Sequence, residues 1–228
     1  VTIIATSLAL SACGSSSEKT DQEQDESVHS SNPDILPYLN IKQQSANFAL
    51  PFCENKNCID VDIQTIQTQD TWLNSWIEKN QATVIQDQIG LNQNMNLQQA
   101  INAYVKKSDA WQAEEKNKSA YELAVYTRMA YQRNEYLLLQ IGLDSKQDGV
   151  NITERYYFFA ADRKQQKALK ILDVIDEKQQ VNMNDFVQKA YQEWLEKQIP
   201  SVKEIAPKKL LWGQADWFFD HEGLGLHF

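Results

Sequence analysis

The chain has 228 residues, a length that favours one domain, and its 42% hydrophobic and 10% aromatic content is sufficient for a packed core. Its 22 basic and 31 acidic side chains give a net charge of −9, which excludes the basic surface that nucleic-acid binding requires. With only three His and three Cys, we expect no cofactor and no metal site.

Residues 1–12 read VTIIATSLALSA, an uncharged apolar run typical of a secretory signal peptide. The run is too short to cross a bilayer of roughly 30 Å as a helix. Because no basic residue precedes it and the chain begins with Val1, we expect the charged start of the signal peptide to lie outside this sequence.

Leu10-Ser11-Ala12-Cys13, followed by Gly14 and three serines, resembles a bacterial lipobox. In that motif the Cys becomes lipid-modified and N-terminal, so we expect Cys13 to anchor a palmitate-bearing lipoprotein to the membrane. Each attached acyl chain contributes about 0.8 kcal/mol per buried CH₂. Gly14 is not the Asp that resembles an inner-membrane retention signal, so the resemblance favours the outer membrane, facing the periplasm.

Residues 13–34 contain almost no apolar side chain and are predicted to be a disordered acidic tether. Six acids and one base lie between Gly14 and Asp34, so the tether carries −5 of the net charge and the remaining chain −4. A coil of this length reaches roughly 25 Å. The globular domain is therefore predicted to span 35–228 and to be only mildly acidic.

Residues 47–52 and 59–66 alternate between apolar and polar side chains, as half-buried strands do. Cys53 and Cys58 lie between them, and their spacing does not match a Cys-x-x-Cys redox motif. In a secreted chain these two cysteines predict a structural disulfide that closes a hairpin loop. Because the loop is short, we expect the bridge to contribute about 2 kcal/mol or less.

The rest of the chain predicts helices, a meander of strands and a final hairpin. Apolar residues recur at helical spacing in three segments, and Trp72 and Trp76 are interpreted as core rather than as a sugar-stacking surface. Strands are expected between polar turns at 133–135, 144–149 and 162–167. The predicted helices are 71–89, 96–116 and 184–199, and the predicted strands are 120–132, 136–143, 152–161, 169–175, 216–219 and 224–228.

This order of elements predicts an α+β fold, in which an antiparallel β-sheet of a meander plus hairpins has about three helices packed on one side. The order also resembles the RsiV-like domain family of bacterial envelope proteins. The segments that carry the resemblance are IDVDIQTIQTQDTWLNSW (59–76), AADRKQQKALKILDVI (160–175) and DWFFDHEGLGLHF (216–228).

The sequence departs from the family in two places within a resemblance that covers roughly 47–228. Members often carry a Gly-Gly-Ala-His-Gly motif where this chain has residues 148–153, which include no His. The best-known relatives bind lysozyme as membrane-anchored anti-sigma factors or accompany polysaccharide deacetylase domains, and the missing His weakens a transfer of lysozyme binding. Members also continue past the last hairpin, so we expect the domain to be truncated at Phe228.

No catalytic motif of the common hydrolases or phosphate-binding loops occurs, and we assign no catalytic residue. Asp216, Asp220, His221 and Glu222 are the candidates for a ligand site, although a solvated turn is the favoured interpretation of these residues. We therefore expect a non-catalytic, lipid-anchored periplasmic binding or sensing protein. Its predicted partners are the membrane and either peptidoglycan or a wall-acting protein such as a hydrolase. The oligomeric state stays open.

Two alternatives remain from the sequence. The first is an envelope hydrolase or esterase that acts on cell-wall glycan, with a site near the turn at 216–222. The second is a structural lipoprotein without a ligand.

Overall fold

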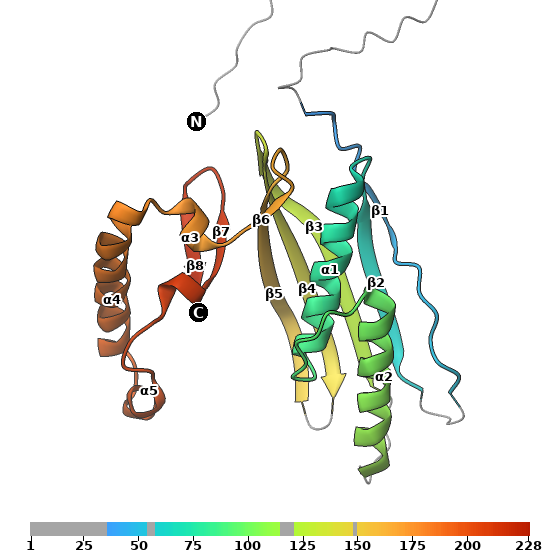
Figure 1. The fold of residues 1–228 in the computed structure, drawn as a ribbon. Helices are drawn as coiled ribbons and strands as arrows, with labels where there is room; N and C mark the ends of the chain where they lie inside the picture. The colour runs from blue at the N-terminus through green and yellow to red at the C-terminus, as the bar shows by residue number, and fades with distance from the viewer. Residues whose placement is uncertain (1–35, 54–57, 115–120, 148–149) are drawn as a thin grey trace, which may run out of the picture. The chain divides into compact units, whose positions relative to one another are not determined.

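The computed structural model describes residues 36–53, 58–114, 121–147 and 150–228 (Figure 1). The predicted signal peptide, the lipid site Cys13 and the whole of the predicted tether lie outside the described residues. Six strands form one sheet in chain order: β1 (Lys42–Ser45), β2 (Asp60–Gln67), β3 (Glu122–Arg133), β4 (Tyr136–Gln147), β5 (Val150–Asp162) and β6 (Lys167–Leu169).

The predicted α+β class is confirmed, with a meander from β3 to β6. The turn between β3 and β4 contains Asn134 at a φ of 54°, in the left-handed region that Asn tolerates. Alternation along β4 sends Leu137, Leu139, Ile141 and Leu143 into one buried cluster, while Leu138 belongs to another. The central strand therefore contributes to a core on each face of the sheet.

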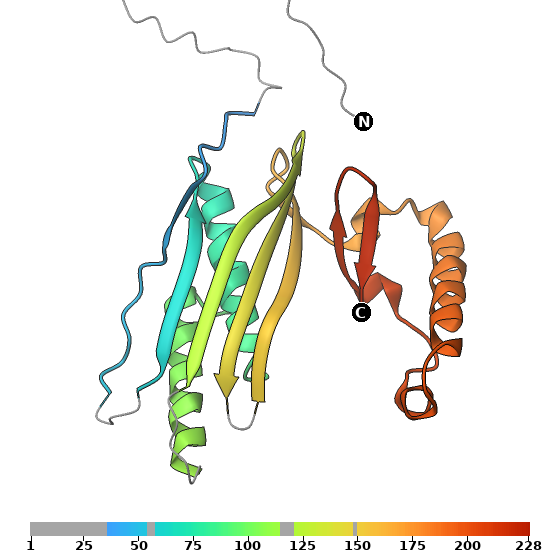
Figure 2. The same ribbon diagram turned by 180° about the vertical axis from the view of Figure 1, so that it is seen from behind.

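One pair of strands, β2 and β3, is parallel, whereas we expected an antiparallel sheet throughout. Two helices, α1 (Thr71–Asp87) and α2 (Leu97–Glu114), connect these strands and form the long crossover that parallel pairing requires. Both helices cover the same face of the sheet, as the two opposite views show (Figures 1 and 2). Their apolar faces meet the sheet in the larger core, which includes Trp76 as predicted.

The expected strand at 47–52 is wrong, because the strand that pairs with β2 is β1, at Lys42–Ser45. The backbone of Ala49 is instead paired with the Gln98 side chain of α2, through an N–H···Oε1 bond of 2.8 Å and an Nε2–H···O bond of 2.7 Å. An extended segment that lies along a helix has the same period-two pattern as a strand. The disulfide between Cys53 and Cys58 is present, but it does not close a β-hairpin.

Two further boundaries differ from the prediction. Strand β4 extends to Gln147 and β5 begins at Val150, so the loop expected at 144–149 is much shorter. The strand expected at 169–175 is wrong, because β6 ends at Leu169 and a short helix, α3 (Ile171–Val174), follows. The Asp173 carboxylate explains the change of direction, since it accepts hydrogen bonds from Lys170 N at 2.7 Å and from Lys167 Nζ at 2.6 Å.

The C-terminal residues form a second core against the opposite sheet face. Two aromatic contacts join the segment to the sheet, with ring centroids 5.3 Å apart for Phe158 and Phe218 and 5.6 Å apart for Tyr131 and Phe219. The elements of this segment are η1 (Glu177–Gln179), α4 (Gln180–Glu196), α5 (Pro200–Ile205), η2 (Trp212–Gln214), β7 (Asp216–Phe219) and β8 (Leu224–His227).

Among the described helices, none has the length and apolar character needed to span a membrane.

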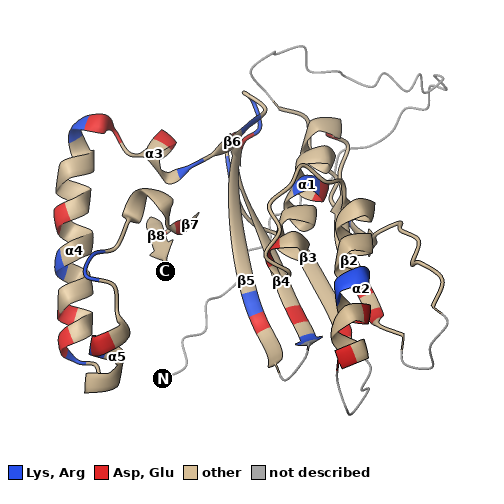
Figure 3. Cartoon of the chain, turned by 60° about the horizontal axis from the view of Figure 1, so that its bottom comes forward, with Lys and Arg blue, Asp and Glu red and all other residues tan. Residues whose placement is uncertain are grey.

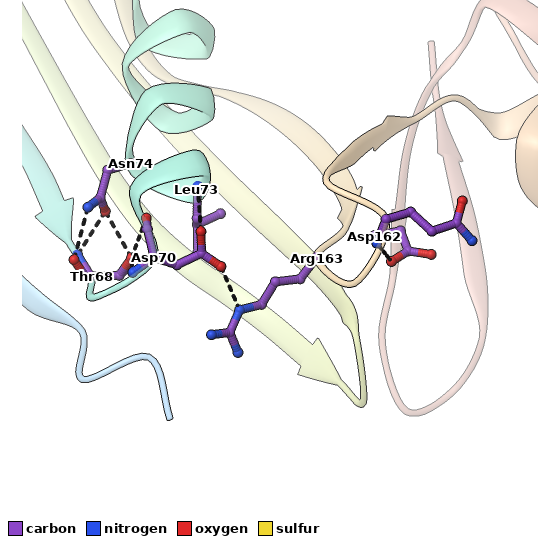
Figure 4. A network of polar contacts seen from close by, with 7 residues as sticks. Thr68, Asp70, Leu73, Asn74, Asp162 and Arg163 are labelled. Carbon is purple, nitrogen blue, oxygen red and sulfur yellow. Dashed lines mark hydrogen bonds and ion pairs between the residues drawn. The ribbon is translucent and has the colours of Figure 1, made fainter. Parts of the chain in front are cut away.

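A polar network at the start of α1 connects this helix to the sheet (Figure 4). Asp70 caps the helix, because its Oδ1 accepts a hydrogen bond from Leu73 N at 3.0 Å. Its Oδ2 lies 2.9 Å from Arg163 Nε, and these side chains are only 16% and 4% exposed. The backbone N–H of Arg163 also donates to Glu135 O at 2.9 Å, so one arginine joins α1, the β3–β4 turn and the β5–β6 turn.

We expect Asp70→Ala to lower the free energy of unfolding by about 3–5 kcal/mol, because it leaves the Arg163 charge buried without a partner. The double variant Asp70→Asn/Arg163→Met is expected to lose less, because no unpaired charge remains. Urea unfolding measures both. Glu122→Ala is the control, since its ion pair with Lys146 is solvent-exposed and should contribute less than about 1 kcal/mol. A loss of about 1 kcal/mol in Asp70→Ala would show that Asp70 acts as a helix cap alone.

Candidate functional site

Three of the predicted site residues, Asp220, His221 and Glu222, lie in the turn between β7 and β8. Asp220 Oδ1 accepts hydrogen bonds from Glu222 N at 2.8 Å and from Gly223 N at 3.1 Å, and the Asp220 N–H donates to Gly223 O. His221 Nε2 lies 3.8 Å from Glu222 Oε1, but both side chains are about four-fifths exposed. The Asp220 carboxylate thus holds the turn, while His221 and Glu222 point into solvent.

The structure does not bring Asp216 to this turn. Asp216 begins β7 and is paired with His227 of β8. Asp216 and Asp220 are therefore separated by the length of β7, roughly 13 Å. Within the described parts of the chain, no three His, Cys, Asp or Glu side chains gather as a potential metal site.

An apolar hollow on the described surface lies between α4, α5 and β8, and we call it the α4–β8 groove. Its volume is about 810 Å³, within the range of ligand-binding pockets. Its lining is apolar: Met183, Phe186, Val187, Ala190, Tyr191, Trp194, Val202, Ile205, Ala206, Pro207, Leu210, Leu224, Leu226 and Phe228.

Side chains of α4 hold the opposite wall of the groove in place. The Gln188 side chain makes two hydrogen bonds with the backbone of Leu210: its Nε2 donates to the carbonyl at 2.8 Å, and its Oε1 accepts from the N–H at 3.2 Å. The Tyr191 hydroxyl donates to Pro207 O at 2.6 Å, and the Tyr191 ring stacks on Trp194 with centroids 5.9 Å apart. Because the walls are fixed by internal bonds, the groove is already formed before a ligand arrives.

The groove exposes large apolar side chains that a stable monomer would be expected to bury. Phe186 is 69% exposed, Ile205 85% and Phe228 58%. Contiguous exposed apolar surface of this kind is typical of protein or membrane interaction sites and of ligand-binding grooves. Acidic and basic side chains both occur along α4, outside the apolar lining (Figure 3).

The sequence predicted helix α4 but did not predict the groove beside it. We expected this helix to pack on the same side of the sheet as the other two, yet Val187 belongs to the second core, and Val187 and Tyr191 are the only buried residues of the helix. The helix begins four residues before the predicted start and ends at Glu196, and Pro200 begins α5 rather than ending α4. The available signal was the width of the apolar face, because Phe186 and Leu195 lie about 180° apart around the helix, more than the roughly 100° of a single apolar stripe.

We expect Asp220→Ala to lower the free energy of unfolding by about 1–2 kcal/mol, since two backbone N–H groups of the turn lose their acceptor. Asp220→Asn keeps the Oδ1 acceptor and should stay close to the wild type. His221→Ala is the control and should change stability by less than about 0.5 kcal/mol, because its side chain is exposed. Urea unfolding of the three variants checks this. Equal stability of Asp220→Ala and wild type would contradict a turn-holding role.

Comparison with known proteins gives a likeness at the level of solved structures. No family model matches the sequence, and no curated protein matches it. A DUF3298 family protein from Pseudomonas aeruginosa PAO1 is similar at 16% identity and a TM-score of 0.48, over 72% of this chain and 69% of that one. A DUF3298 family member from Bacteroides fragilis NCTC 9343 is similar at 14% identity and a TM-score of 0.48, over 82% of each chain. Both are solved structures of DUF3298 family proteins, and the resemblance to the RsiV-like domain family stays a prediction.

Proposed function

We propose that this chain is a lipid-anchored binding protein of the bacterial cell envelope, with an RsiV-like domain whose α4–β8 groove holds an apolar segment of a protein partner, such as a cell-wall hydrolase. The observation that carries the proposal is the row of exposed apolar side chains in a preformed groove, above all Phe186, Trp194 and Ile205.

The composition of the groove supports a protein as the occupant. Aromatic side chains at the centre of an interface provide most of its binding energy, and a polar rim excludes water around them. Phe186 and Trp194 lie two turns apart on α4, a spacing of roughly 12 Å that matches the apolar anchors of an amphipathic helix. The charges of this segment do not single out an anionic lipid as the occupant, because residues 185–209 contain four acidic side chains as well as five basic ones.

Two features support the envelope location. The lipobox-like sequence that ends at Cys13 provides the anchor, and the acidic residues up to Asp34 provide a spacer. The disulfide between Cys53 and Cys58 is the kind of bond that persists in oxidising compartments and is rare in the bacterial cytosol. For a protein in this location, the proposed partner is a protein of the periplasm.

The anchor is tested by Cys13→Ser in the full-length precursor. We expect the wild-type protein to sediment with the outer membrane and the variant to lose lipid modification and leave the membrane fraction, because a thioether cannot form on serine. Cys58→Ser is the control and should still sediment. Mass spectrometry of the mature protein checks the modification. An unmodified Cys13 in a mature wild-type protein would overturn the anchor.

The groove is tested by placing a photo-crosslinking phenylalanine analogue at Phe186 in intact cells. We expect an adduct with one periplasmic protein, identified by mass spectrometry and then purified for binding measurements. Phe186→Ser and Ile205→Ser should each lower the affinity for that partner about tenfold or more, because a buried anchor is lost.

Phe52 provides the matched control, since its ring is 89% exposed and does not line the groove. The crosslinker at Phe52 should give no adduct with the same partner, and Phe52→Ser should keep the affinity within about twofold of wild type. Adducts only with a second copy of the chain, only with phospholipid, or with nothing would each overturn the proposed occupant.

A further inference from the structure

A second hollow lies on the sheet face turned away from α1 and α2. Along β3, Val125 and Thr127 are buried beneath the helices, and Tyr126 between them points to the other face. The same alternation places Gly142 of β4 and Tyr156 of β5 on this face. Tyr126, Gly142 and Tyr156 are direct neighbours across three strands, and we call them the tyrosine platform.

Gly142 allows both rings to lie against the sheet. A Cβ atom on Gly142 would lie 3.2 Å from Tyr156 Cε1 and 3.4 Å from Tyr126 Cδ2, so the rings approach the glycine from either side. Despite this contact, Tyr126 is 43% exposed and Tyr156 is 45% exposed. The two aromatic surfaces are therefore fixed by the sheet and open to solvent.

Hydrogen-bonding groups surround the platform and are held in position. Arg128 Nε donates to Gln140 Oε1 at 2.5 Å, and Gln43 Nε2 donates to Thr127 O at 3.4 Å. The Tyr126 hydroxyl donates to Asp144 Oδ2 at 2.8 Å, and this bond raises the pKa of the tyrosine above its usual value. The hollow has a volume of about 310 Å³, and Gln43, Arg128 and Gln140 line it together with the platform.

We propose that the tyrosine platform binds an oligosaccharide. A sugar ring has a face of C–H groups and a rim of hydroxyls. A site that binds such a ring therefore needs an aromatic surface, whose face is negative, together with polar groups close to it. The amides of Gln43 and Gln140 both donate and accept, whereas the Arg128 guanidinium additionally selects a carboxylated sugar.

The site is separate from the proposed protein-binding groove. No residue of the platform lines the α4–β8 groove, so either site can fail without the other. The platform also suits a sugar better than a protein anchor, because its apolar surface is two rings bordered closely by amide and charged groups. The choice of cell-wall saccharides as probes rests on the proposed envelope location, but the sugar chemistry itself does not.

The proposal is tested with the full-length mature protein by isothermal titration calorimetry against two probes. Chitotetraose is the neutral probe, and a soluble peptidoglycan disaccharide-peptide is the carboxylated one. We expect Tyr156→Ala to weaken binding about tenfold through the loss of a stacked ring, and Tyr156→Phe to stay within about threefold of wild type. Arg128→Gln should weaken the carboxylated probe more than chitotetraose.

Tyr136→Ala is the matched control, because Tyr136 is 40% exposed and lies at the start of β4, away from the hollow. It should keep the affinity within about twofold, and thermal unfolding of each variant confirms that the fold is retained. Binding of either probe that Tyr156→Ala weakens and Tyr156→Phe preserves supports the proposal. It is overturned if neither probe binds at concentrations up to about 10 mM, or if Tyr156→Ala binds as wild type does.

Discussion

The buried ion pair between Asp70 and Arg163 is the constraint on which the arrangement of the larger core depends. Both charged groups are largely withdrawn from water, and each would be costly to bury alone. The same aspartate caps α1, and the backbone N–H of the same arginine donates a hydrogen bond to Glu135 O. One pair therefore sets where the crossover helix begins relative to two turns that are distant in the sequence.

With α1 fixed, the sheet has two different faces. The face toward α1 and α2 is filled by the larger core, and the opposite face is only partly covered, where Phe218 and Phe219 meet Phe158 and Tyr131. Strand β4 supplies side chains to both cores, which explains its almost complete burial from Leu137 to Leu143. The uncovered remainder of the second face is where the tyrosine platform lies.

The two proposed binding surfaces differ in their physical character. The α4–β8 groove is apolar and lined largely by helix side chains, properties that suit a partner able to bury its own apolar residues. The platform mixes aromatic faces with amide and guanidinium groups, properties that suit a ligand with both C–H and hydroxyl surfaces.

The sequence by itself determined the elements whose periodicity is strong: both crossover helices, the meander from β3 to β5, helix α4 and the final hairpin. It also determined the pairing of Cys53 with Cys58, because only two cysteines remain after the predicted lipid site. Only the tertiary structure decided that 47–52 is not a strand, since the backbone of Ala49 is paired with the Gln98 side chain of α2. It also decided that Phe186 is exposed and that Tyr126 and Tyr156 meet over Gly142. Periodicity reports which residues share a face, but only the packed chain decides whether that face is covered.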